Sequence, residues 1–207
     1  MQRLYGLSAY LPAVLPPDHG EGVPDEVALV MYRTQNAYHE AKRCIGGRAY
    51  SELHELVFDM KASQSGFPRL FDGAVEPDQP YHLFDASVDW QAGSARLVVG
   101  RLRTGVAPDA LIARVRDEAT ALQKSRGGLD AVIFCVTPRC LLWWEHEPDV
   151  ERAKPPVSDR FGAVVDILFA GAPRLLRVPT DITAPYAGLT LRPAGDFVSM
   201  QFPRLWE

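Results

Sequence analysis

Four consecutive runs decide the fold: VALVMYR (27–33), TQNAYHEAKRC (34–44), IGG (45–47) and RAYSELHELVFD (48–59). The first run is apolar on both of its alternating faces, which is typical of a central strand that is covered on both sides. A helical pattern follows, and either Thr34 or Asn36 can cap its first turn with a side-chain oxygen. Gly46 and Gly47 are predicted to break or kink this helix, and a second helical piece is predicted over about 48–60.

The chain downstream continues to alternate between strand and helix patterns. Residues 83–90 alternate between apolar and polar side chains, and 95–102 follow a short Gly-containing turn, so a β-hairpin is predicted. Apolar residues at helical spacing predict a helix that opens at Pro108 and ends before Gly127. Residues 129–136 form one more predicted strand, again apolar on both faces.

The order of these elements from 27 to 136 is β-α-β-β-α-β, which predicts an α+β protein with a ferredoxin-like, split-βαβ sheet. Small domains of this architecture often pair their open sheet faces, so a homodimer that forms a dimeric α/β barrel, or a fused barrel in one chain, is expected. Residues 1–148 are predicted to be the ferredoxin-like domain and 149–160 a polar, proline-containing linker. Residues 161–207 are predicted to form a β-rich extension packed on that domain, or alternatively a second, degenerate ferredoxin-like half.

The composition narrows the classes of partner. Of the 207 residues, 47% are hydrophobic, which is enough for a substantial core, and the net charge of −4 argues against nucleic-acid binding. No apolar run approaches the roughly 18 residues needed to span a bilayer, so no membrane partner is expected. The three cysteines at 44, 135 and 140 contain no CxxC pair, which argues against a disulfide framework or a zinc ribbon. A cytoplasmic protein is therefore predicted, and the sequence points to no cofactor and no metal.

A histidine lies on the apolar side of the second helical piece. Tyr50, Leu53, His54 and Val57 occupy positions i, i+3, i+4 and i+7, so they share one helix face. Histidine exchanges protons near neutral pH, and Tyr50 one turn away can orient the imidazole or donate a proton, so His54 and Tyr50 are the predicted catalytic pair. The alternative is a buried structural histidine that is bonded to a backbone carbonyl.

Two arginines flank the glycine pair and are candidates for ligand binding. Glycines that lead into a helix N-terminus expose backbone amides, and Arg48 adds a guanidinium beside them. Together with Arg33 they would hold an anionic or carbonyl-bearing small organic molecule. Two glycines and an arginine fall far short of a phosphate-binding loop or a dinucleotide motif, so a simple helix break with solvated arginines is the alternative interpretation.

The run WWEHE (143–147) concentrates aromatic and ionisable side chains. On a strand, Trp144 and His146 share one face, and Trp143 and Glu145 share the other. Trp144 is therefore a candidate ligand-binding platform with an acid–base partner beside it. Packing in a core or at a protein interface, where tryptophan is enriched, is the alternative.

Two functions from different classes fit these patterns. The first is a small-molecule-binding protein or an enzyme of the proton-transfer type, such as an isomerase, a cyclase or a cofactor-independent oxygenase. The second is a non-catalytic accessory protein that docks a partner chain through its apolar sheet and Trp143/Trp144, with His54 in a structural role. No nucleophile signature such as GxSxG is present to favour a third class.

Overall fold

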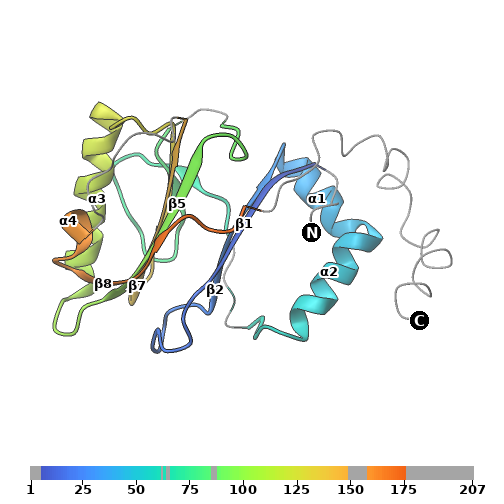
Figure 1. The fold of residues 1–207 in the computed structure, drawn as a ribbon, viewed down its shortest axis with the longest axis horizontal. Coiled ribbons are helices and arrows are strands. Elements are labelled where there is room, and N and C mark those ends of the chain that lie inside the picture. The colour runs from blue at the N-terminus through green and yellow to red at the C-terminus, as the bar shows by residue number, and fades with distance from the viewer. Residues whose placement is uncertain (1–5, 62, 64–65, 85–87, 149–157, 176–207) are drawn as a thin grey trace. The chain divides into compact units, whose positions relative to one another are not determined.

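The computed structural model describes residues 6–61, 63, 66–84, 88–148 and 158–175 (Figure 1). It shows the mixed α+β architecture that the sequence predicts, with one two-stranded and one six-stranded sheet. The elements are β1 (Leu7–Val14), β2 (Glu26–Tyr32), α1 (Gln35–Arg43), α2 (Ile45–Glu55), β3 (Arg69–Leu70), β4 (Tyr81–His82), β5 (Ser94–Leu102), α3 (Pro108–Ser125), β6 (Ala131–Val136), β7 (Cys140–Glu147), α4 (Ser158–Phe161) and β8 (Val165–Gly171).

The chain divides into two compact units. Unit 1 comprises residues 1–11, 28–65 and 175–207, and unit 2 comprises 12–27 and 66–174. The two-stranded sheet of β1 and β2 passes from one to the other, with its base in unit 1 and its tip in unit 2.

Unit 1 is built on the base of the β1–β2 hairpin. The strands run antiparallel, because the Arg33 N–H donates to the Gly6 carbonyl at one end (2.8 Å) and the Leu15 N–H donates to the Asp25 carbonyl at the other (2.9 Å). A small core packs Leu7, Tyr10 and Ala41 with Val30, Tyr32 and Cys44. Burial raises the pKa of Tyr32 to about 12, so this phenol stays protonated.

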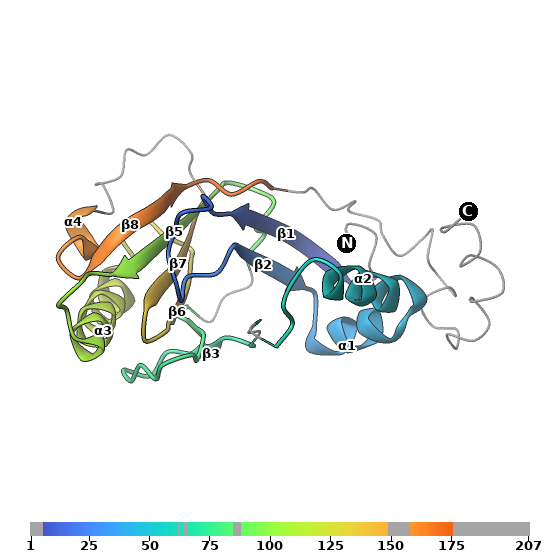
Figure 2. The ribbon, with the colours of Figure 1, turned by 90° about the horizontal axis from the view of Figure 1, so that it is seen from below.

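The break between α1 and α2 falls at Cys44, not at the predicted glycines. Cys44 has extended backbone angles and caps both helices. As the C-cap of α1, its N–H donates to the Glu40 carbonyl, and as the N-cap of α2, its sulfur accepts from the Gly47 N–H. A Cβ on Gly47 would overlap the carbonyl oxygen of Ala41, so this glycine permits the close approach of α1 and α2 (Figure 2). The predicted cap at Thr34 is confirmed, because its hydroxyl accepts from the Ala37 N–H at 3.0 Å.

Unit 2 contains a sheet of order β3-β4-β6-β7-β5-β8, in which every neighbouring pair except β3–β4 is antiparallel. β5 and β6 both run antiparallel to β7, which lies between them, and α3 connects them. β7 and β8 likewise both run antiparallel to β5 between them, and α4 lies in their connection.

Two predicted strand pairings are wrong. β2 pairs with β1 in the separate two-stranded sheet and is not a central strand of the six-stranded sheet. The segment 83–90 does not form a hairpin with 95–102: residues 85–87 lie outside the described residues, β4 at Tyr81–His82 pairs with β6, and β5 takes β7 and β8 as neighbours. The six-stranded sheet is open in the described residues, because its end strands β3 and β8 are not paired with each other. No closed barrel is formed in this part of the chain.

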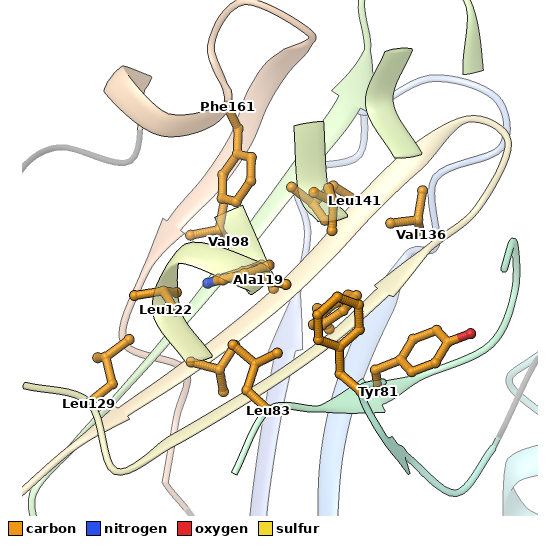
Figure 3. Packing of buried hydrophobic residues seen from close by; sticks show 14 of the residues in the cluster. Tyr81, Leu83, Val98, Ala119, Leu122, Leu129, Val136, Leu141 and Phe161 are labelled. Carbon is orange, nitrogen blue, oxygen red and sulfur yellow. The ribbon is translucent and has the colours of Figure 1, made fainter. Parts of the chain in front are cut away.

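The main core of unit 2 lies between α3 and one face of the six-stranded sheet. α3 begins at Pro108 as predicted and ends where Arg126 adopts a left-handed conformation with φ of 51°. Its buried stripe of Leu111, Val115, Ala119 and Leu122 follows the helical repeat. These side chains pack on Val98, Phe134, Leu141 and Trp143 of the sheet and on Phe161 of α4 (Figure 3).

The predicted C-terminal segments are described only in part. Residues 149–157 of the predicted linker lie outside the described residues, and its last positions begin α4. Within the predicted β-rich extension, β8 adds to the edge of the sheet beside β5. The predicted strands at AGLTLRP (187–193) and DFVSMQF (196–202) lie outside the described residues. No helix in the described part of the chain is long and apolar enough to cross a membrane.

Candidate functional site

The two predicted catalytic residues lie in direct contact on α2. The Nδ1 atom of His54 is 2.9 Å from the carbonyl oxygen of Tyr50, and the centroids of the two rings are 3.9 Å apart. A carbonyl oxygen only accepts hydrogen bonds, so Nδ1 is the donor in this contact. In a neutral imidazole the proton therefore sits on Nδ1, and Nε2 carries the lone pair. Nε2 has no hydrogen-bond partner among the described residues.

Aromatic rings enclose the imidazole along the helix. Phe58 lies one turn beyond His54, with its ring centroid 5.3 Å from the imidazole, and Tyr50 lies one turn before it. The hydroxyl of Tyr50 is 3.5 Å from the hydroxyl of Tyr10, a buried residue of β1. The imidazole is thus held by a backbone bond and two rings, and Tyr50 links it to the hairpin of unit 1.

The face that carries His54 is more open than the sequence pattern indicates. Leu53 is 47% exposed and Val57 is 75% exposed, while His54 itself is half-buried. The prediction that this face points into the protein is therefore wrong for its aliphatic members. The physical reason is that α2 packs through Ile45 and Gly47 at its first turn, so its last turn extends beyond the buried contact.

The two candidate arginines are both exposed. Arg33 follows β2 directly. Arg48 lies in the first turn of α2, about 9 Å along the helix axis and about 120° around it from His54. The Gly47 N–H is not available to bind a ligand in this geometry, because it donates a hydrogen bond to the sulfur of Cys44 at 3.4 Å. The predicted anion site at the helix N-terminus is thus partly occupied by the protein's own cap.

Trp144 and Trp143 are both buried, in unit 2. Trp144 is 4% exposed and lies in register between Leu97 of β5 and Ile133 of β6. Trp143 is fully buried in the core under the helices, and its ring stacks on Phe134 with centroids 5.2 Å apart. Neither indole offers an open stacking platform in this structure.

A buried ionic cluster, which the sequence patterns did not reveal, lies beside Trp143. Glu145 of β7 is 1% exposed. Its Oε2 accepts from Nη2 and Nε of Arg96 at 2.7 and 3.2 Å, and its Oε1 accepts from Nε1 of Trp143 at 2.8 Å and from Nη1 of Arg160. Arg160 belongs to α4 and also lies 3.6 Å from Glu118 of α3, so the cluster joins the sheet to both helices.

The charges of this cluster keep Glu145 ionised. Burial by itself acts to raise the pKa of this carboxyl group, but the hydrogen bond and charge of Arg160, the charge of Arg96 and the Trp143 N–H lower the pKa to about 2. A carboxylate with so low a pKa is a poor proton acceptor near neutral pH. The cluster is therefore a structural device that holds α4 to the sheet.

His146 lies on the opposite sheet face from Glu145 and is also buried, at 2% exposure. Its Nδ1 is 2.6 Å from Oδ1 of Asp130, and its Nε2 is 2.6 Å from the carbonyl oxygen of Ala92. Trp90 packs on the ring with a centroid distance of 5.1 Å. Both ring nitrogens are engaged, so His146 has no free nitrogen for a substrate and instead ties the 90–92 turn to β7.

The sequence could have indicated part of this arrangement. The alternation in WWEHE places Glu145 and His146 on opposite faces, and this is correct. Arg160 could not be found, because it is distant in sequence and sits in a segment with linker-like composition. Among the described residues, no group of three His, Cys, Asp or Glu side chains is placed to hold a metal ion.

Comparison of the chain with protein-family models, with curated proteins and with solved structures finds no significant match.

Proposed function

We propose that this protein binds a small organic molecule and transfers protons to and from it, with Nε2 of His54 as the base. The observation that carries the proposal is the hydrogen bond from Nδ1 of His54 to the Tyr50 carbonyl, which supports a bare Nε2 on a half-buried ring. An imidazole base in contact with a phenol is the minimal machinery for isomerisation, cyclisation or cofactor-independent oxygenation.

The proposed ligand is an anionic or carbonyl-bearing molecule. Exposed Leu53 and Val57 beside His54 favour an apolar body on that ligand, and a carbonyl group would acidify the C–H bond from which Nε2 removes the proton. Arg48 or Arg33 would bind an anionic end through a guanidinium, provided that the ligand is long enough to reach from His54. Tyr50 would return a proton or orient the substrate.

The alternative function, a non-catalytic accessory protein, finds less support. It depends on an open docking surface at Trp143 and Trp144, and both side chains are buried. A structural role for His54 is the remaining part of that alternative. This alternative predicts that loss of the His54 imidazole lowers the stability of the protein without altering the binding of any ligand.

A test of proton transfer does not need the natural substrate. A panel of β-dicarbonyl compounds and α-keto acids is incubated with the protein in D₂O, and loss of the acidic C–H signal is followed by ¹H NMR. We expect His54→Gln to lower the protein-dependent exchange rate by about 10² or more, the usual contribution of a general base, with an unchanged Tm. His39→Gln, at an exposed histidine of α1 in the same unit, is the matched control and should keep the wild-type rate. Equal exchange rates in the two variants, or no protein-dependent exchange with any compound, would contradict the proposal.

We further propose that residues 94–171 are the ferredoxin-like part of the chain, in place of the predicted 27–136. This is supported by the element order β5-α3-β6-β7-α4-β8, by the strand order β6-β7-β5-β8 with antiparallel neighbours, and by the packing of α3 and α4 in one core. Association into a homodimer remains a prediction, and native mass spectrometry of the purified chain would measure it together with any bound small molecule.

A further inference from the structure

The turn between β1 and β2 belongs to unit 2 and is attached to the six-stranded sheet of that unit by two arginines. Nη1 of Arg101 in β5 donates to the carbonyl oxygen of His19 at 3.3 Å. Nη1 of Arg139, at the turn between β6 and β7, lies 3.1 Å from Oε1 of Glu21. The attachment through Arg101 therefore depends on where the turn holds the backbone of His19.

The imidazole of His19 makes two hydrogen bonds inside this turn, and only 9% of the residue is exposed. Nδ1 is 3.0 Å from the carbonyl oxygen of Gly20, and Nε2 is 3.0 Å from Oδ1 of Asp25. A carbonyl oxygen and an ionised carboxylate only accept hydrogen bonds, so both ring nitrogens must donate. The charged imidazolium can make both bonds. A neutral imidazole carries one N–H, so it can make only one of them.

We propose that His19 is a pH-dependent switch, which closes the β1–β2 turn when it is protonated and loosens the turn from the sheet when it loses its proton. In the neutral ring one nitrogen lone pair would face an oxygen atom, which is repulsive, so the ring must move. The same residue accepts the hydrogen bond from Arg101 through its carbonyl oxygen. Movement of His19 therefore weakens the attachment of the turn to β5.

The groups within the turn favour the protonated ring. The hydrogen bonds to Gly20 and Asp25 raise the pKa of His19 above 6.5, and the charges of Asp25 and Asp18 act in the same direction, whereas burial acts to lower it. The folded state therefore binds this proton more tightly than the unfolded chain. The stabilisation by His19 is fully present below about pH 6.5 and is lost as the pH rises through the raised pKa.

The charged groups on the sheet side of the turn are cations that have acidic partners. Arg101 lies 3.9 Å from Oδ2 of Asp166 in β8, and Arg139 is paired with Glu21. These arginines and acids keep their charges over the pH range in which histidine titrates. A change in the turn over that range therefore reports on His19.

An NMR titration tests whether the Asp25 contact holds the proton on His19. The Cε1–H signal of His19, assigned by its absence in His19→Gln, should give a pKa above 6.5 in the wild-type protein. Asp25→Asn should lower this pKa more than Asp18→Asn, because both variants remove one acidic charge beside His19 but only Asp25 is bonded to its ring. A wild-type pKa at or below 6.5, or equal effects of the two variants, would overturn the proposal.

Hydrogen exchange of single amides tests whether the turn responds. The Leu15 N–H, which donates to the Asp25 carbonyl beside the turn, should lose protection several-fold between pH 6 and pH 8.5, after correction for the intrinsic pH dependence of exchange. The Arg33 N–H, bonded to Gly6 at the other end of the hairpin, is the matched control and should keep its protection.

In His19→Gln, which cannot take up a proton, protection of the Leu15 amide should be low and independent of pH. Constant protection of Leu15 in the wild type, or an equal loss in His19→Gln or at Arg33, would contradict a switch at His19. The inference is independent of the proposed function, because neither measurement requires a ligand or turnover.

Discussion

Arg96 of β5 and Glu145 of β7 lie directly opposite each other in the strand register, and Nη2 of the arginine is 2.7 Å from Oε2 of the glutamate. Arg160 of α4 binds the other carboxylate oxygen of Glu145. A pair of charges this deeply buried is kept only if each charge has a counter-charge, because an uncompensated buried ion is very unfavourable. In the core of unit 2, two guanidinium groups therefore share the Glu145 carboxylate, and Arg160 has Glu118 at 3.6 Å as a second counter-charge.

Removing that carboxylate should destabilise unit 2 strongly. We expect Glu145→Gln to lower the free energy of unfolding by about 3 kcal/mol or more, because it removes the buried carboxylate that both Arg96 and Arg160 bind. Urea unfolding measures the change. Asp117→Asn, an exposed acid-to-amide change on α3, is the control and should cost less than about 0.5 kcal/mol. Equal, small effects of both substitutions would show that the cluster does not hold the fold.

The same residue gives a pH dependence of defined sign. The pKa of Glu145 falls from 4.5 to about 2 on folding, so the folded state favours the ionised form. Its stabilisation is therefore fully present above about pH 5 and is lost as the pH falls toward 2, with a total of about 3 kcal/mol. The difference in unfolding free energy between wild type and Glu145→Gln, measured in urea from pH 6 to pH 2.5, should shrink over this range. A difference that is constant with pH would be inconsistent with a carboxylate held by arginines.

The turn between α1 and α2 predicts opposite effects for two adjacent glycines. Gly47→Ala should lower the free energy of unfolding by about 1–3 kcal/mol, because its Cβ would overlap the Ala41 carbonyl. Gly46 is exposed, so Gly46→Ala should leave stability unchanged or raise it by up to about 1 kcal/mol through helix propensity. Thermal or chemical unfolding of the two variants measures both. Equal changes in the unfolding free energy of the two variants would contradict the view that Gly47 is required for the close approach of α1 and α2.

His146 should act as a clamp on the 90–92 turn. Asp130→Ala removes the acceptor of Nδ1 and leaves a buried imidazole nitrogen without its partner, which should cost about 1–3 kcal/mol. Hydrogen exchange should then be faster in the turn next to Trp90 than in wild type. Asp117→Ala, an exposed aspartate on α3, serves as the control and should change neither quantity appreciably. Unchanged hydrogen exchange in Asp130→Ala would contradict this role of His146.

The sequence predicted individual helices and strands better than it predicted which strands pair with each other. The α3 helix, β6 and the cap at Thr34 follow local rules, because propensity, capping and apolar spacing act within a few residues. The pairing of β2 was mispredicted, because the sequence pattern of an apolar strand does not indicate which sheet the strand joins. The partners of β5 were missed for a related reason: β8 lies beyond a segment that resembles a linker, so nothing local marks it as a neighbour.

The candidate site shows the same division. The contact between Tyr50 and His54 follows from their i, i+4 spacing, and the structure places them together. The openness of Leu53 and Val57 could not be predicted, because it depends on where α2 leaves the rest of unit 1. The Glu145 cluster could not be predicted either, because Arg96, Glu145 and Arg160 belong to three elements that are distant in sequence and meet only in the folded core.

The position of the proton on His54 tests the proposed function most directly. In protein labelled with ¹⁵N-histidine, long-range ¹H–¹⁵N spectra distinguish protonated from bare ring nitrogens, and the His54→Gln spectrum assigns the signals. At a pH where the ring is neutral, we expect a proton on Nδ1, bonded to the Tyr50 carbonyl, and a bare Nε2. A proton on Nε2 with a bare Nδ1 would contradict it, because the nitrogen proposed as the base would already be occupied.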